Sequence, residues 1–401
     1  MKRHMRRTAV AASLAGIALL ATACAGNSGE AGAGPAEETE TAQAATEGRI
    51  AVTYEGGVAV LDPETLEVIA ELPSEEFTRV NNFGDGRTIA VSTSEGFQML
   101  DTVEPELTDL VFDATAPGHV VVHHGHVTLF DDGTGTTTML HADAFADGYD
   151  ELPEAETYVA DAPHHGVSIV LEDHTLVTTV GTEDSRFGAV ALHAHDDHWD
   201  EVASNAECPG IHGEGTAADE AVIFGCEDGA LLYKDEEFVK LAAPDEFGRM
   251  GNAFVSETSP LVVGDYKNDP DAEGYLLNAV TIIDTAAQTL EVVDLPDEVQ
   301  YTFRDVARGP GDLAYILSTD GQIHVLDPET GELTDAYPVI EAWEGPAEWQ
   351  DPHPAIKVNG DIAYVTEPAT NSVHAVDLTT GEVLTSIELE HTPNEIAVAI
   401  G

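Results

Sequence analysis

The sequence predicts an all-β fold, a β-propeller of about eight four-stranded blades, and two observations lead to it. After residue 48, short apolar segments alternate with Gly, Asp, Asn and Pro, and no stretch keeps the 3.6-residue apolar period of a helix. A strand–turn–strand unit built around an aspartate also recurs at 58–68, 280–292, 323–333 and 373–383. Repeats of about 40–50 residues with four short strands each are typical of propeller blades.

The repeats also set the expected limits of the blades. Seven innermost strands are expected to begin near Asn81, His119, His164, Ile211, Gly251, Asp305 and His353. The remaining blade is split: residues 49–72 supply its three outer strands, and residues 395–400 supply the innermost strand. Such a closure removes open sheet edges. Seven blades is the alternative if one of these units is not a full blade.

The N-terminus has the layout of a bacterial lipoprotein signal. Basic residues precede an apolar stretch from Ala9 to Leu20, which is too short for a permanent membrane span, and small residues then lead into Cys24. We expect residues 1–23 to be removed and Cys24 to be acylated. An ordinary secretory signal cut near Ala23 is the alternative.

Three regions follow from this layout. Residues 1–23 are the lipoprotein signal peptide, residues 24–47 are a disordered tether without bulky apolar side chains, and residues 48–401 are the propeller domain. We therefore expect an exported protein, periplasmic or extracellular, that is lipid-anchored to the outer face of the cell membrane. We expect it to be a monomer.

The balance of charge excludes one class of partner. The chain has 75 acidic and 15 basic residues and a net charge of −60, so the phosphates of a nucleic acid would be repelled. Outside the signal only Cys208 and Cys226 remain, an even pair in an oxidising compartment. A disulfide is the first interpretation, and two thiolate metal ligands are the alternative.

Histidines recur at one position of the repeat, just after a Pro/Gly turn and at the start of an innermost strand. Because innermost strands line the central channel, side chains from separate blades are expected to converge there on a transition metal such as zinc, which prefers about four ligands. A histidine bonded to a neighbouring backbone group is the alternative at any one position. The expected ligands are His119, His165 and His212, with His353 fourth and His164 and His123 as reserves.

A second, low-affinity metal cluster is expected in a turn. His193 and His195 alternate on one face of a strand, and His198 follows after Asp196 and Asp197. A solvated polar turn is the alternative. For the axial site, Asp351 or Glu214 is expected to complete the ligand shell or to orient an imidazole.

Three stretches resemble the AztD-type zinc metallochaperones of bacterial ABC zinc-uptake systems. They are PGHVVVHHGHVTLFDDGTG at 117–135, DAPHHGVSIVL at 161–171, and CPGIHGEG at 208–215 with GCEDG at 225–229. The resemblance implies a propeller that holds Zn²⁺ in a partly occluded site and hands it to the zinc-binding solute-binding protein of an ABC importer. It places His119, His165 and His212 on matching motifs and extends to His353 and His123. The tether departs from the pattern, because it has no histidines where some relatives carry a His-rich segment.

Two other classes of function remain open. A metal-dependent propeller hydrolase or lactonase would need an open coordination position and a nearby acid or base, for which Glu214 is the candidate. An interaction scaffold would leave the histidines bonded to the backbone and without metal. Imidazole also suits copper(II) and nickel, so zinc rests on the resemblance. Metal affinity is expected to fall as the pH drops through the histidine pKa, which is normally about 6.5.

Overall fold

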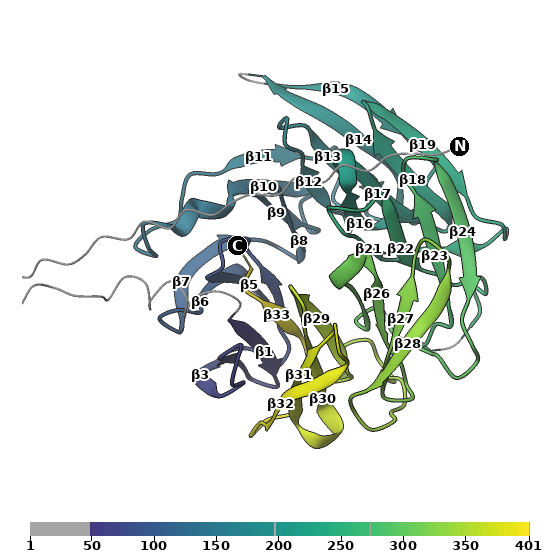
Figure 1. Ribbon diagram of the computed structural model, residues 1–401. Helices are drawn as coiled ribbons and strands as arrows, with labels where there is room; N and C mark the ends of the chain where they lie inside the picture. Colours follow the sequence, from purple (N-terminus) through teal and green to yellow (C-terminus); the bar gives the residue numbers. More distant parts are fainter. Residues whose placement is uncertain (1–48, 196–197, 273, 401) are drawn as a thin grey trace, which may run out of the picture.

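Eight antiparallel sheets of short strands stand around one axis in the computed structural model, which describes residues 49–195, 198–272 and 274–400. In Figure 1 the colour passes once around the ring, so that the last strands return to lie beside the first. The predicted eight-bladed propeller is therefore confirmed. The expected signal peptide, Cys24 and the tether lie outside the described residues, as do Asp196 and Asp197.

Each of the first four sheets along the chain runs from an innermost strand at the axis to an outermost strand at the rim. The sheet that joins the two ends contains, in this order, β33 (Ile396–Val398), β1 (Ile50–Tyr54), β2 (Gly57–Leu61) and β3 (Val68–Pro73). The next contains β4 (Arg79–Asn82), β5 (Thr88–Thr93), β6 (Gly96–Asp101) and β7 (Glu106–Asp113). The third contains β8 (Pro117–His123), β9 (His126–Asp131), β10 (Thr136–His141) and β11 (Glu156–Val159). The fourth contains β12 (Ser168–Val170), β13 (Leu176–Thr182), β14 (Ser185–His195) and β15 (His198–Asn205).

The second half of the ring repeats the pattern. The fifth sheet contains β16 (His212–Ala217), β17 (Ala221–Cys226), β18 (Asp228–Lys234) and β19 (Glu237–Ala242), and β20 (Gly248–Arg249) pairs with β18. The sixth contains β21 (Ala253–Phe254), β22 (Leu261–Asp265), β23 (Ala279–Asp284) and β24 (Thr289–Asp294). The seventh contains β25 (Val306–Arg308), β26 (Ala314–Leu317), β27 (Gln322–Asp327) and β28 (Glu332–Pro338). The eighth contains β29 (Ala355–Asn359), β30 (Ile362–Glu367), β31 (Ser372–Asp377) and β32 (Glu382–Glu388).

Four short 3₁₀ turns lie between strands of these sheets: η1 (Ala142–Phe145), η2 (Ala218–Glu220), η3 (Pro310–Asp312) and η4 (Pro368–Thr370). No helix in the described ranges has the length and apolar character that a membrane span requires.

The ring closes where the sequence predicts, between the two ends of the propeller domain. β33 pairs antiparallel with β1, with Val52 opposite Ile396 and Ile50 opposite Val398. The Thr53 N–H also donates to the carbonyl of Glu395 at 2.9 Å, which extends the pairing by one residue. Because the last strand pairs with the first, the inner edge of β1 is not left open for another chain to pair with.

Position within a blade explains the burial of each strand. In β2 all five residues are buried, because both faces of a middle strand pack against neighbouring blades. The outermost strand β3 alternates exposed and half-buried side chains. The aspartates of the repeat hold the turn between the third and fourth strands: Asp62 Oδ1 accepts the Thr65 N–H at 2.9 Å, and Asp377 Oδ1 accepts the Thr379 N–H at 2.8 Å.

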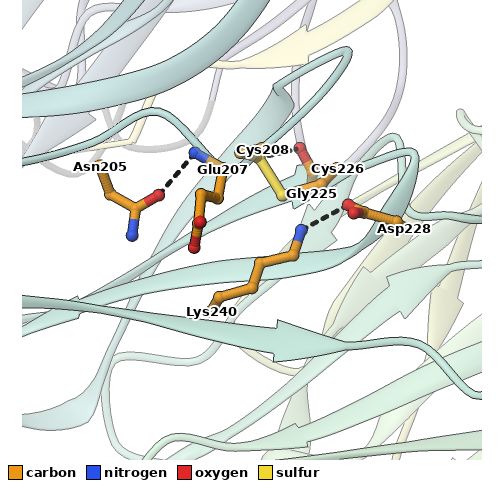
Figure 2. The surroundings of a disulfide bond; sticks show 7 residues. All are labelled: Asn205, Glu207, Cys208, Gly225, Cys226, Asp228 and Lys240. Atoms are coloured by element: carbon orange, nitrogen blue, oxygen red, sulfur yellow. Dashed lines mark hydrogen bonds and ion pairs between the residues drawn. A yellow bond between two sulfur atoms is a disulfide. The ribbon is translucent and has the colours of Figure 1, made fainter.

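Cys208 and Cys226 form a disulfide, so the first interpretation of this pair is confirmed. Figure 2 shows the bond between the segment that precedes β16 and the end of β17. Both cysteines are fully buried in the core between the fourth and fifth blades. The disulfide therefore ties the segment just before His212 to β17, the neighbouring strand of the sheet in which His212 lies.

Candidate metal centre

Three consecutive blades each bring one histidine to the same part of the axis. His119 lies in β8 within a register shift between Pro117 and Val120, and His212 is the first residue of β16, next to a second shift. His165 lies in the turn that precedes β12. β-Bulges re-aim side chains locally, which is how two strand residues can turn toward the channel. Gly213, in the second shift, has φ +60°, a conformation that favours glycine.

The three imidazoles form a compact triangle. Their ring centroids are 5.2 Å apart for His119 and His165, and 5.1 Å apart for each of the other two pairs. One nitrogen of each ring lies within 4.8 Å of one nitrogen of both others. The side chain of His165 is 42% exposed, whereas that of His119 is 21% exposed, so one corner of the triangle is open to water.

Hydrogen bonds fix which nitrogen two of these rings present. His165 donates from Nδ1 to Asp132 Oδ2 at 2.5 Å, and His212 donates from Nδ1 to the carbonyl of Gly251 at 2.5 Å. In neutral rings both protons are thereby placed on Nδ1, and both Nε2 atoms carry lone pairs. These two Nε2 atoms face each other at 3.1 Å. Two nitrogens on one tetrahedral zinc lie about 3.4 Å apart, so an ion between them would relieve the repulsion of their lone pairs.

The surroundings of His119 and His212 keep these two imidazoles neutral. Burial, followed by the neighbouring histidines, lowers the pKa of His119 well below its usual value. Burial also lowers the pKa of His212 to about 3. Neutral imidazole is the form that binds a metal, so neither ring needs to lose a proton at neutral pH. The decline in affinity expected near pH 6.5 therefore does not come from these two residues.

Glu214 lies in β16, the strand that begins with His212, and its carboxylate stands beside His119. Its Oε2 is 3.7 Å from His119 Nδ1, beyond hydrogen-bond distance. Burial raises the pKa of Glu214 to about 7. Glu214 and the three histidines line one cavity of about 730 Å³.

The structure does not bring the other three expected ligands to this triangle. His353 is buried in its turn, donates from Nδ1 to the carbonyl of Asp351 at 2.7 Å and packs against Phe303. His164 bonds through both nitrogens, to the Ala162 carbonyl and to Thr179 Oγ1. Both histidines thus bond a neighbouring backbone carbonyl through Nδ1, which is the alternative to metal binding that the sequence left open. Asp351 accordingly orients His353 through its carbonyl and does not reach the triangle.

His123 belongs to a separate group, at the far end of β8 from His119. His123, His124 and Glu220 offer ligand atoms that lie within 4.8 Å of one another. His123 Nε2 is 3.0 Å from Glu220 Oε1, and His124 Nε2 is 3.4 Å from Glu172 Oε1. The backbone N–H of Glu172 in turn donates to Glu220 Oε2 at 3.0 Å, which fixes the Glu220 carboxylate against the main chain of the fourth blade.

The expected second cluster is only partly assembled in the described residues. His195 and His198 stack at 5.3 Å between ring centroids, and their Nε2 atoms lie 3.2 and 3.4 Å from the two oxygens of Asp200. His193 turns elsewhere and bonds Thr175 Oγ1 at 2.9 Å. A third group of possible ligands, Glu71, Glu390 and His391, is exposed.

Sequence reasoning missed the carboxylates that hold these histidines. Asp132 comes from the third blade and orients His165 of the fourth, and Glu220 reaches His123 across two blades. Asp132 does lie in the DDG turn that follows β9, within one of the stretches that carry the family resemblance. Its position there was the one available signal.

Fold and site together define an eight-bladed β-propeller with a triangle of oriented histidines in an axial cavity. No family model matches the chain. The sequence is, however, 24% identical over 303 residues to the zinc chaperone AztD of Citrobacter koseri, covering 75% of this chain and 70% of that protein. The resemblance to AztD-type proteins is therefore confirmed.

Solved structures agree on the fold. The apo structure of Citrobacter koseri AztD covers 88% of this chain and 96% of its own, with a TM-score of 0.71 and 21% identity. A crystal structure of the same protein gives a TM-score of 0.68, with 21% identity and the same coverage of both chains. The dihydro-heme d1 dehydrogenase NirN in complex with DHE gives a TM-score of 0.61 at 14% identity, covering 87% of this chain and 74% of its own.

Proposed function

We propose that this chain is an extracytoplasmic zinc metallochaperone that holds Zn²⁺ between His119, His165 and His212. The observation that carries the proposal is the pair of Nε2 lone pairs that face each other at 3.1 Å, with both Nδ1 protons held elsewhere. Carboxylate or carbonyl acceptors behind ligating histidines are the usual support of a zinc site. The likeness to the zinc chaperone AztD favours zinc over copper(II) and nickel.

The open corner suits transfer of the metal to another protein. Three protein nitrogens leave the fourth position of a tetrahedral zinc to an incoming ligand. Since His165 is the most exposed of the three, a partner's side chain meets the metal on that side and replaces the histidines one at a time. We propose that the partner is the zinc-binding solute-binding protein of an ABC importer, and that the chain acts as a monomer.

Export is part of the same proposal. We propose that the basic and apolar segments before Cys24 direct export, and that acylation of Cys24 anchors the chain to the outer face of the membrane. The Cys208–Cys226 disulfide supports an oxidising compartment.

The His123–His124–Glu220 group is the second place at which we propose the chain holds the metal. Two imidazoles and a carboxylate are a common zinc ligand set. We also retain a weaker capture role for His193, His195 and His198, of which the last two meet at Asp200.

A metal-dependent hydrolase is the second candidate, and the position of Glu214 is what favours it. A carboxylate beside three nitrogen ligands can act as a general base on a metal-bound water. The zinc-loaded domain should hydrolyse lactone or ester substrates if this candidate holds, and Glu214→Gln should abolish that hydrolysis.

Elemental analysis tests the principal proposal. We expect zinc in the mature domain purified without added metal, and loss of one equivalent in both His165→Ala and His212→Ala. His324→Gln is the matched control, because His324 bonds Asp320 outside the groups described above. Direct transfer is then followed by mixing the zinc-loaded domain with a metal-free solute-binding protein in the presence of a chelator that traps free zinc. A domain that binds no zinc tighter than micromolar at neutral pH would end the proposal.

A further inference from the structure

The cavity that contains the histidine triangle also gathers positive charge. Arg79, Arg249, Arg304 and Lys357 all line it. The chain has only 15 lysines and arginines, four of which lie among the first seven residues, so four of the remaining eleven share this one cavity. With 75 acidic residues in the chain, basic side chains could find carboxylate partners almost anywhere on the protein. The overall composition therefore does not explain why four basic side chains share one cavity.

Two of the four cations are paired. Arg79 Nε lies 3.2 Å from Glu395 Oε1, and Arg304 reaches the same oxygen at 2.9 Å. Arg304 also donates to Asn394 Oδ1 and to the Trp349 carbonyl, so its guanidinium is held rigidly at the wall. One carboxylate thus serves two guanidinium groups.

The other carboxylates of the wall do not form ion pairs with the remaining cations. Asp265 accepts the backbone N–H groups of Gly251 and Asn252 and the Asn252 side-chain amide. Glu214 stands beside His119. Within residues 49–195, 198–272 and 274–400, neither Arg249 nor Lys357 forms an ion pair or a side-chain hydrogen bond.

Cations that have no ion pair in the described part of the chain, in the cavity that the histidines also line, have an electrostatic consequence. A bare divalent cation in the cavity is repelled by Arg249 and Lys357, whereas a ligand that carries negative charge is attracted by them. Arginine and lysine donate charge-assisted hydrogen bonds to carboxylates, and arginine does so in a bidentate geometry. The rings of Trp349, Phe303 and Tyr275 supply apolar wall for a carbon skeleton.

We propose that the axial cavity is a binding site for a small organic anion with two or more carboxylates, recognised by Arg249 and Lys357. The cavity volume of about 730 Å³ accommodates such an anion next to the triangle. This site goes beyond the proposed zinc function and does not require it, since the anion binds the metal-free protein. Where zinc is present as well, the two ligands favour each other's binding, because the anion offsets the repulsion between Zn²⁺ and the cations.

Titration calorimetry of the metal-free mature domain with citrate tests the site. We expect saturable binding of one citrate, an affinity that decreases with added NaCl, and a loss of at least about tenfold in both Lys357→Gln and Arg249→Gln. Neither side chain forms an ion pair in the described residues, and Asp265 and Glu395, the buried carboxylates within their electrostatic reach, keep their hydrogen bonds in both variants. Lys267→Gln removes the same charge outside the cavity wall and should leave citrate affinity unchanged.

Two further arms make the outcome decisive. Lys357→Arg keeps the charge and should retain citrate binding, which separates a charge effect from a folding defect. Inorganic phosphate, which lacks a carbon skeleton, should bind at least about tenfold more weakly than citrate. Absence of citrate binding, equal losses in Lys267→Gln, or phosphate binding as tight as citrate binding would each overturn the proposal. None of these results depends on whether the protein binds zinc.

Discussion

The carboxylate of Asp132 occupies space that only a glycine leaves free at position 118. A Cβ on Gly118 would lie 2.3 Å from Asp132 Oδ1, and the same carboxylate holds Nδ1 of His165. Gly118 directly precedes His119 in the chain. The same short segment therefore carries His119 and leaves space for the carboxylate that orients His165.

Gly118→Ala should therefore weaken zinc binding by displacing Asp132. We expect affinity to fall by roughly 10- to 100-fold, the usual effect of losing the hydrogen-bond partner of a zinc-ligating histidine. Competition with a fluorescent zinc chelator measures it. Asp132→Ala should give a similar loss, and the double variant should be no worse than Asp132→Ala, because both changes remove one interaction. Additive losses in the double variant would contradict this route.

The second metal group gives a stoichiometric prediction. Glu220→Gln and His124→Ala should each remove one zinc equivalent while the axial equivalent remains, because neither side chain is near the triangle. Zinc titration followed by elemental analysis of the dialysed protein counts the ions. His141→Gln is a suitable control, since His141 faces His126 at 5.0 Å between ring centroids but belongs to none of the three groups of possible metal ligands in the described residues. An unchanged count in Glu220→Gln would show that this group binds no metal.

Removal of the disulfide should lower stability and loosen the approach to His212. The bond spans 18 residues, for which loop-closure entropy gives roughly 2–4 kcal/mol. Urea unfolding of Cys208→Ala/Cys226→Ala should show a loss of this size, and a reducing agent should affect only the wild type. A wild type whose midpoint does not move on full reduction would argue against a stabilising role.

How much of this the sequence could predict depends on how local each feature is. The ring closure and the aspartate turns, as at Asp62 and Asp377, follow from repeats that are visible in the chain. The meeting of His119, His165 and His212 follows from their common position within a blade. His353 has the same Pro–His context, yet its imidazole bonds the Asp351 carbonyl, a choice of side-chain direction that the repeat does not encode.

The supporting carboxylates could not be predicted, because their role depends on distances between blades. Asp132 reaches His165 from a neighbouring sheet, and Glu220 reaches His123 from two sheets away, so neither has a fixed spacing in sequence. These distances are set by how the blades pack against one another, and that packing depends on all eight blades of the ring.

A buried acid outside the groups of possible metal ligands should make stability depend on pH. Asp305 is fully buried; its Oδ2 accepts the N–H and the hydroxyl of Thr302, and its Oδ1 has no partner in the described part of the chain. Burial raises the pKa of Asp305 to about 8, against 3.8 for a free aspartate. The folded protein therefore keeps a proton that the unfolded chain loses.

The sign of this effect follows directly from the two pKa values. Below about pH 4 both states are protonated and the contribution of Asp305 to stability is complete. Between about pH 4 and 8, unfolding releases the proton, so stability falls as the pH rises, by up to about 1.4 kcal/mol per pH unit. Asp305→Asn cannot titrate and should lack this decline, becoming more stable than the wild type at pH 8. Urea unfolding at pH 5, 6, 7 and 8 measures both slopes, with the exposed Asp361→Asn as control. Parallel slopes for the wild type and Asp305→Asn would mean that Asp305 is already ionised in the folded protein.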